Sequence, residues 1–209
     1  MAWHYVTTDQ PGWTQVYSQD QEDNVLEIWN ILRANGWTEN SASAVCGNFQ
    51  VESYLNPGQW ELYHNYDMNY GMGLGQWTPA TKVSNHVGST NHDAMANGSA
   101  QMDLLITTPS QYSTYYLNPD GSSTYYGETG LPYIATMAEF SQSTASIEDL
   151  TKLWAICWER PDASYYQQSI SDRKQHAGHW FDVIHGSTPT GIDPKIVILM
   201  KNKRGEELY

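Results

Sequence analysis

The stretch that decides the fold is residues 47–58, which read GNFQVESYLNPG. Upstream, residues 42–49 repeat small and apolar side chains at helical spacing, and Glu52 falls on roughly the same face. Asn56-Pro57-Gly58 then stops a helix. The pattern predicts a helix that carries Glu52 on its apolar face, close to its C-terminal end.

A carboxyl group in such a position has a possible chemical use. Loss of hydration favours the protonated form of a carboxyl group, which is how enzymes keep a general acid ready near neutral pH. Glu52 is therefore a candidate acid catalyst. The alternative is a helix-end acid paired with Lys or Arg, and for an isolated Glu this is the commoner situation.

The segment that follows this helix is rich in glycine and aromatic residues. Residues 70–80 read YGMGLGQWTPA. Glycines let the backbone approach a ligand closely, Gln76 offers an amide that can orient a substrate, and Tyr70 and Trp77 offer stacking faces. We expect residues 59–79 to form a loop or a short β-hairpin.

Further from this centre, the chain alternates helical patterns with polar loops. Helices are predicted over 21–35, around 94–107, over 146–159 and over 164–185. Asn40 or Ser41 could cap the helix that carries Glu52. Residues 108–132 predict a Tyr-rich surface hairpin with its turn at Asn118-Pro119-Asp120-Gly121.

The two ends of the chain differ in character from the middle. Residues 1–20 are predicted to form an irregular arm, and the start of the chain lacks the basic and apolar regions of a signal peptide. Residues 187–209 suggest a linker followed by a short apolar strand at 196–200, as if a further domain came next. No apolar run approaches the ~20 residues of a spanning helix.

Charge and composition exclude several kinds of partner. The chain has 23 acidic and 10 basic residues, for a net charge of −13, which argues against nucleic acid and anionic membranes as partners. Trp (9) and Tyr (15) greatly outnumber Phe (3), as expected where aromatic rings are displayed on wet surfaces.

Cysteine and histidine give no sign of a metal site. Cys46 and Cys157 could form one bridge, but two buried free thiols are the favoured interpretation. Asp172, His176 and His179 share a helix face at a spacing that can hold a metal, although a polar helix face explains them better. We expect no metal and no cofactor.

Three motifs together resemble the phage tail lysozyme family. Residues 47–58 fit its GN-x-Q-x-ES-x-x-NPG pattern, residues 73–80 fit GLxQWTPA, and residues 159–161 read ERP. The resemblance covers roughly residues 22–185. It implies an α+β, mainly α, lysozyme-like fold with a small β-hairpin region beside the catalytic helix, and a catalytic domain over 21–186.

The resemblance also implies roles for particular residues. Glu52 would be the acid that protonates the glycosidic oxygen between N-acetylmuramic acid and N-acetylglucosamine, and a second carboxylate would support the charge that develops. The family pattern marks no matching second acid in this chain, but position in the aromatic segment facing the helix end makes Asp67 the candidate for that role, with Glu61 as the other possibility. Substrate contacts are expected from Glu61, Tyr63, Tyr70, Gln76, Trp77 and Glu159.

Alternatives stay open at three points. Arg160-Pro161 could lock the following helix, with Glu159 in a structural role and not in the site wall. Relatives that use a single carboxylate give an anhydro product, so hydrolase and lytic transglycosylase are both possible. A non-catalytic module that binds wall glycan or a receptor is the alternative function, and a peptidase ranks last.

The resemblance finally implies a place of action. The protein would sit at the tail tip of a virion, among other phage tail subunits, and cut peptidoglycan glycan strands to open the cell wall for DNA entry. A net charge of −13 fits delivery by a particle better than free diffusion to an anionic wall.

Overall fold

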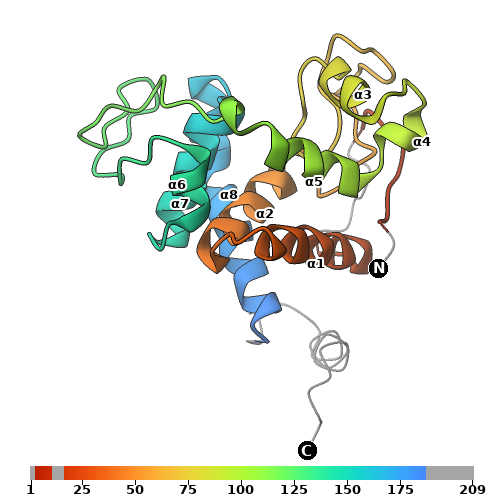
Figure 1. Cartoon of the computed structure of the whole chain (residues 1–209). Helices are drawn as coiled ribbons and strands as arrows, with labels where there is room; N and C mark the ends of the chain where they lie inside the picture. Colours follow the sequence, from red (N-terminus) through yellow and green to blue (C-terminus); the bar gives the residue numbers. More distant parts are fainter. Residues whose placement is uncertain (1–2, 11–16, 187–209) are drawn as a thin grey trace, which may run out of the picture.

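A computed structural model describes residues 3–10 and 17–186 of the chain, and these residues form a mainly helical fold (Figure 1). Short helical turns accompany the α-helices: the 3₁₀ turn η1 (Pro109–Gln111) and the π-helical turn η2 (Ala155–Glu159). The α-helices are α1 (Gln19–Ala34), α2 (Glu39–Ser53), α3 (Thr81–Val87), α4 (His92–Met95), α5 (Gly98–Thr107), α6 (Met137–Gln142), α7 (Ile147–Trp154) and α8 (Ala163–Ile184).

Helix starts follow local capping chemistry. Ser18 and Gln21 form a reciprocal capping box at the start of α1. α2 begins at Glu39, two positions earlier than a cap at Asn40 would allow, because Thr38 is the cap and its side chain accepts the backbone N–H of Ser41. The helices predicted over 21–35, 94–107, 146–159 and 164–185 are present, while α3 and α6 were not predicted.

The centre of the fold is α2, which packs against α8, α7 and α1. Every residue from Ser41 to Gln50 is buried. At Gly47 the backbones of α2 and α8 cross so closely that an added Cβ would lie 2.6 Å from the Ala177 Cβ and from the carbonyl oxygen of Arg173. Gly47 thus lets α8 lie directly against the helix that carries Glu52.

The predicted hairpins are not found in the part of the chain that the structure describes. Residues 59–79 hold one antiparallel bridge, between Trp60 and Met72, and the Tyr-rich segment holds one between Ser123 and Glu128. In the first loop, consecutive turns bond His64 to Glu61 and Asp67 to His64 through their backbones. These local bonds use the groups that a strand ladder would need. The predicted turn at Asn118–Gly121 is present, with Gly121 N–H donating to the Asn118 carbonyl.

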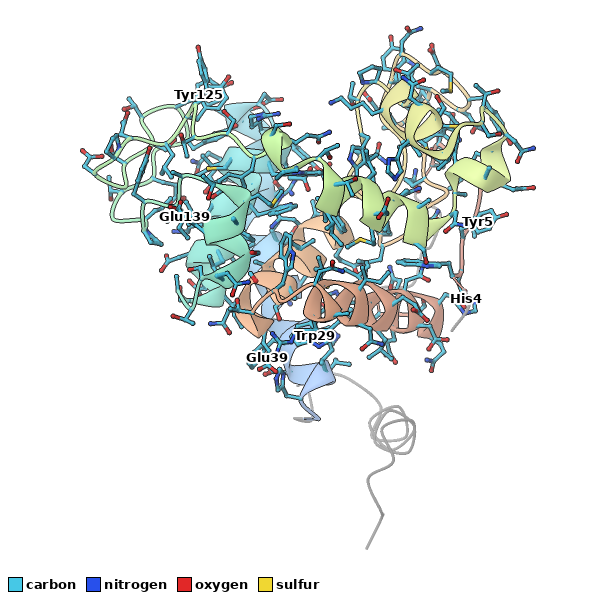
Figure 2. All side chains as sticks on the ribbon, viewed as in Figure 1. His4, Tyr5, Trp29, Glu39, Tyr125 and Glu139 are labelled. Atoms are coloured by element: carbon cyan, nitrogen blue, oxygen red, sulfur yellow. The ribbon has the colours of Figure 1, made fainter. Side chains whose placement is uncertain are left out.

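The helices place two loops on opposite sides of the molecule. Figure 1 shows α3, α4 and the loop before α3 on one side, and α6, α7 and the loop over 112–136 on the other, with α5 between them. Exposed tyrosines gather on the second loop, where Figure 2 shows Tyr125 at the outer edge. A cleft lined by residues from both sides lies between them.

Three further sequence predictions can be compared with the described residues. Cys46 and Cys157 are buried and free, as favoured. None of the described helices combines the length and apolar character that a membrane span requires. The predicted strand at 196–200 falls outside the described residues.

Candidate active site

A cleft of about 620 Å³ lies between the two loop regions, with the end of α2 in its wall. One side comes from residues 59–62 and 75–82, and the opposite side from residues 158–162 and Gln111. The predicted site residues that line it are Glu52, Glu61, Gln76, Trp77 and Glu159. The fold therefore brings five of the eight predicted side chains into one cavity.

Glu52 occupies the last turn of α2, and its surroundings fix that turn in place. Tyr54 leaves the helix in the left-handed conformation, with φ of 57°. The Ser53 hydroxyl bonds to the carbonyl oxygens of Phe49 (3.1 Å) and Leu74 (2.9 Å), which ties the helix end to the glycine-rich loop. Ser53 thus joins the end of α2 to the glycine-rich segment on the other side of the cleft.

The Asn-Pro-Gly turn after α2 has a similar anchoring role. Asn56 accepts the backbone N–H groups of Val6 and Gly58, each at 3.0 Å, and its amide donates to the Val6 carbonyl at 2.7 Å. The turn is thereby fixed to residues 3–10. Gln101 of α5 anchors the glycine-rich loop in a similar way, because its side-chain oxygen accepts the backbone N–H of Leu74 at 2.8 Å.

Arg173 of α8 is the charged partner of Glu52. Its guanidinium is fully buried and forms an ion pair with the Glu52 carboxylate, whose side chain is 15% exposed. It also donates to the Asn48 side-chain oxygen (2.8 Å) and the Ser169 hydroxyl (3.2 Å). Burial alone lowers the pKa of an arginine, but the carboxylates of Glu52 and Glu159 outweigh it and raise the pKa of Arg173.

Glu159 is the second carboxyl group near Glu52. It ends the π-helical turn η2, and its carboxylate accepts a hydrogen bond from the Trp154 indole at 3.1 Å. Burial and the charge of Glu52 raise the pKa of Glu159 well above its ordinary value, against the opposing effect of Arg173. The raised pKa favours the protonated form of Glu159, although the positive charges of Arg173 and Arg160 act against it.

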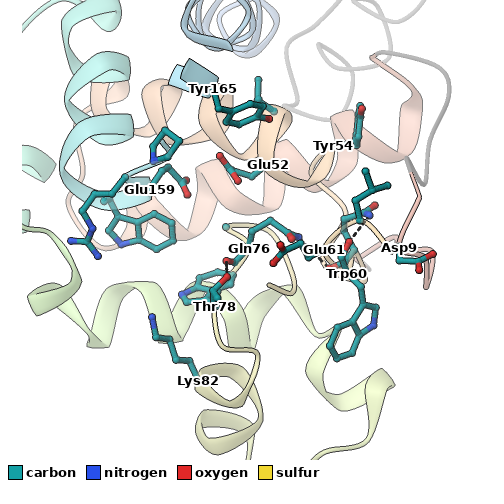
Figure 3. Close-up of a pocket in the computed structure, with 18 of the residues that line it drawn as sticks. Asp9, Glu52, Tyr54, Trp60, Glu61, Gln76, Thr78, Lys82, Glu159 and Tyr165 are labelled. Atoms are coloured by element: carbon teal, nitrogen blue, oxygen red, sulfur yellow. Dashed lines mark hydrogen bonds between the residues drawn. The ribbon is translucent and has the colours of Figure 1, made fainter. Parts of the chain in front are cut away.

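The opposite wall carries Glu61 and Gln76 (Figure 3). Glu61 is held over the loop because its carboxylate accepts Gly71 N–H at 2.8 Å. The Gln76 amide donates to the carbonyl oxygens of Gly73 (3.1 Å) and Gln59 (3.3 Å). Figure 3 shows Glu52 between Glu159 on one side and Glu61 on the other. Acids therefore face the cleft from three separate segments of the chain.

Three predicted site residues lie away from the cleft wall. Asp67 was predicted as the second catalytic acid, but its carboxylate accepts both the backbone and the side-chain N–H of Asn69 and so stabilises a turn. Tyr63 is 76% exposed, and Tyr70 stacks on His64. None of the three lines the cavity, because the successive turns of this loop direct them outward. Glu61 replaces Asp67 as the candidate on this wall.

The aromatic lining differs from the expected one as well. Trp60 and Trp77 line the cleft but are each only 2% exposed, so they contribute edges and little open stacking surface. Tyr54 and Tyr165, which the sequence did not single out, also line it. Trp158 is buried at 5% exposure and also lines the cleft.

Arg173 was also missed, although the sequence carries a signal for it. The buried face of α8 includes Tyr166, Ala177 and Trp180, and Arg173 falls on that same face. A lone arginine among apolar positions of a helix requires an anionic partner. That signal could have been matched to Glu52, the acid on an apolar face of another helix.

The predicted polar face of α8 has structural contacts. The His176 ring nitrogen Nδ1 lies 2.7 Å from the Tyr17 hydroxyl, and His179 stacks on the Tyr17 ring. Within residues 3–10 and 17–186, no group of three or more His, Cys, Asp or Glu side chains could hold a metal ion.

Two comparisons relate the chain to known proteins. A family model described as phage tail lysozyme matches residues 23–184. The chain is also 31% identical, over 169 residues, to Morphogenesis protein 1 of Bacillus phage B103. That match covers 81% of this chain and 41% of the relative, so the chain spans about two fifths of the relative's length.

Proposed function

Because this chain belongs to the phage tail lysozyme family, we propose that it cleaves peptidoglycan glycan strands with Glu52 as the general acid. The bond cut is the one between N-acetylmuramic acid and N-acetylglucosamine. The observation that carries the proposal is the cleft itself, in which Glu52, Glu61 and Glu159 line one cavity of about 620 Å³. A site that only binds a neutral sugar has no need for three acids.

The chemistry requires a proton on Glu52, and Glu159, whose raised pKa favours its own protonated form, is the neighbour that can pass one to the Glu52 carboxylate. Arg173 and Asn48 fix this part of the cleft: the guanidinium binds one oxygen of Glu52 and the side chain of Asn48. Glu52 protonates the glycosidic oxygen as the bond to the anomeric carbon breaks. Positive charge then develops on the sugar that loses the leaving group.

The fate of that charge decides the product. Glu61, on the opposite wall, is the carboxylate placed to stabilise it or to activate water, and water addition gives a reducing end. If the substrate's own 6-hydroxyl group attacks the anomeric carbon and gives its proton to the Glu52 carboxylate left by the first step, the product is an anhydro sugar. Because only the first reaction also needs an activated water, Glu61→Gln is expected to reduce the yield of reducing ends more than the yield of anhydro ends.

Placement on a virion completes the proposal. Similarity to a phage morphogenesis protein supports a component of the tail that opens the cell wall for DNA entry, at the tail tip and among other tail subunits. A net charge of −13 opposes free diffusion to an anionic wall. Attachment to a particle removes that difficulty, because it supplies a high local concentration.

Clearing of cell walls in a gel tests the activity directly. Wild-type protein should clear the walls and Glu52→Gln should not, because the amide cannot donate the proton. Glu148→Gln, on the exposed surface of α7, is the matched control and should clear like wild type. No clearing by wild type, or clearing by Glu52→Gln, would contradict the proposal.

A further inference from the structure

A second cavity, of about 270 Å³, adjoins the cleft, and the proposed cleavage does not use it. Val51, Tyr54 and Tyr165 line both cavities, so the two tyrosines form a shared wall. Figure 3 shows these tyrosines flanking Glu52. The rest of the second cavity is lined by Gln50, Gln168, Ser169, Asp172 and His176. A group attached to a sugar beside Glu52 could therefore enter it.

Gln50 gives this cavity an unused acceptor. The residue is 2% exposed, and its side-chain oxygen has no hydrogen-bond partner among the described residues. Native proteins rarely leave a buried polar atom without a partner, since its desolvation is costly. An N–H or O–H donor from a bound ligand would satisfy the Gln50 oxygen.

Asp172 gives the cavity a negative charge that no described cation neutralises. The neighbouring Arg173 is directed to Glu52, and Lys174 pairs with Glu148 at 3.7 Å. His176 contacts the Tyr17 hydroxyl, and burial lowers the pKa of His176, so it is neutral near pH 7. The cavity thus presents acceptor oxygens and one uncompensated carboxylate, which suits an ammonium group and disfavours a carboxylate.

We propose that this cavity binds the peptide stem of peptidoglycan, with a peptide N–H on Gln50 and a primary ammonium group of the stem on Asp172. The inference rests on the proposed function, because the stem is attached to the N-acetylmuramic acid beside the bond that Glu52 would cut. The shared wall of Tyr54 and Tyr165 lets sugar and stem bind at the same time. The protein would then distinguish stem-bearing from bare glycan.

The test compares cleavage rates on two substrates that share one glycan. One is peptidoglycan with its stems, and the other is the same glycan after an amidase has removed them. Wild type should cut the stem-bearing glycan about tenfold faster, the effect of one charge-assisted hydrogen bond. Asp172→Asn and Gln50→Leu should each lower this preference by about threefold or more.

The controls separate this inference from the proposed function. Asp182→Asn, an exposed carboxylate on the same helix and outside both cavities, should keep the wild-type preference. Acetylation of the stem amine should lower the preference of wild type and leave that of Asp172→Asn unchanged. If Gln50→Leu does not fold, Asp172→Asn still tests the stem site, because Asp172 is exposed and its substitution leaves the core intact.

Two results would overturn the inference in distinguishable ways. If wild type cuts neither substrate, the proposed function fails and the stem site fails with it. If wild type cuts both substrates at the same rate, or if Asp172→Asn keeps the full preference, the stem site is wrong and the glycosidase stands.

Discussion

At the scale of single residues, we expect the side chain of Arg173 to contribute strongly to the free energy of unfolding. It is fully buried and its ion-pair partner is Glu52. Arg173→Met leaves the carboxylate without its partner, and we expect a loss of about 3–5 kcal/mol in the free energy of unfolding. Urea denaturation measures this loss.

The neighbouring lysine is the matched control for Arg173. Lys174 lies on the same helix and pairs with an exposed Glu148 at 3.7 Å. Lys174→Met should cost less than about 1 kcal/mol, as exposed pairs do. If both variants lost the same free energy of unfolding, the buried ion pair would contribute no more to stability than the exposed one.

The raised pKa of Glu159 predicts that the stability of the protein depends on pH. Its pKa is raised above the ordinary 4.5 in the folded protein, first by burial and then by the charge of Glu52. Its stabilising contribution is therefore complete below pH 4.5 and is lost as the pH rises through the raised pKa. Glu159→Gln mimics the protonated form, so wild type should lose stability relative to this variant as the pH rises.

The measurement for Glu159 is urea unfolding of both proteins from about pH 4 to about pH 8. The difference should grow by on the order of 1.4 kcal/mol for each pH unit between the two pKa values. A difference between the proteins that stays constant across this range would contradict a raised pKa.

At the scale of elements, the crossing of α2 and α8 positions the site. Gly47→Ala would put a methyl group 2.6 Å from the backbone and side chain of Ala177. The helices must then separate, at an expected cost of about 1–3 kcal/mol, and Arg173 moves away from Glu52. We expect lower stability together with lower wall-clearing activity.

Gly178→Ala is the control for this crossing. An added Cβ there meets no atom within 4 Å, so the better helix propensity of Ala should leave stability unchanged or raise it by up to about 1 kcal/mol. The comparison uses thermal unfolding of both variants. If Gly47→Ala and Gly178→Ala unfolded at the same temperature, the close contact between α2 and α8 at Gly47 would not be needed for stability.

The longer helices were predictable from the sequence, whereas the short helices α3 and α6 and the course of residues 59–79 were not. Helix α1 repeats apolar residues at a helical period, and its bonds are local. The position of Asp67 instead depends on a series of turns and on its bond to Asn69, which leave no periodic signal. Glu52 and Glu61 do line the cleft; a motif marked Glu52, and Glu61 is an acid close to it in the chain.

The ion pair between Glu52 and Arg173 is a second feature that the sequence could not predict. Glu52 and Arg173 lie 121 positions apart in the chain and are joined by the crossing of two helices. The sequence allowed an Arg partner for Glu52 but did not identify it. A pairing between distant helices requires their packing to be known.

At the scale of the whole molecule, the net charge of −13 predicts an unusual dependence on salt. Anionic wall polymers repel the free chain, and salt screens that repulsion, with a Debye length of ~10 Å at 0.1 M. Lysis of intact walls should therefore rise as salt increases from low concentration. Walls stripped of anionic polymers should be cut faster and with little salt dependence. Strong lysis of intact walls at the lowest salt would contradict this.

The most direct test of Glu52 as a glycan-cleaving acid is mass spectrometry of the fragments released from purified cell walls. Wild type should release glycan fragments with new sugar ends, either reducing or anhydro, and Glu52→Gln should release none. A reducing end identifies hydrolysis, and an anhydro end identifies transglycosylation. Fragments that are cut only in their peptides, with intact glycan strands, would contradict the central claim.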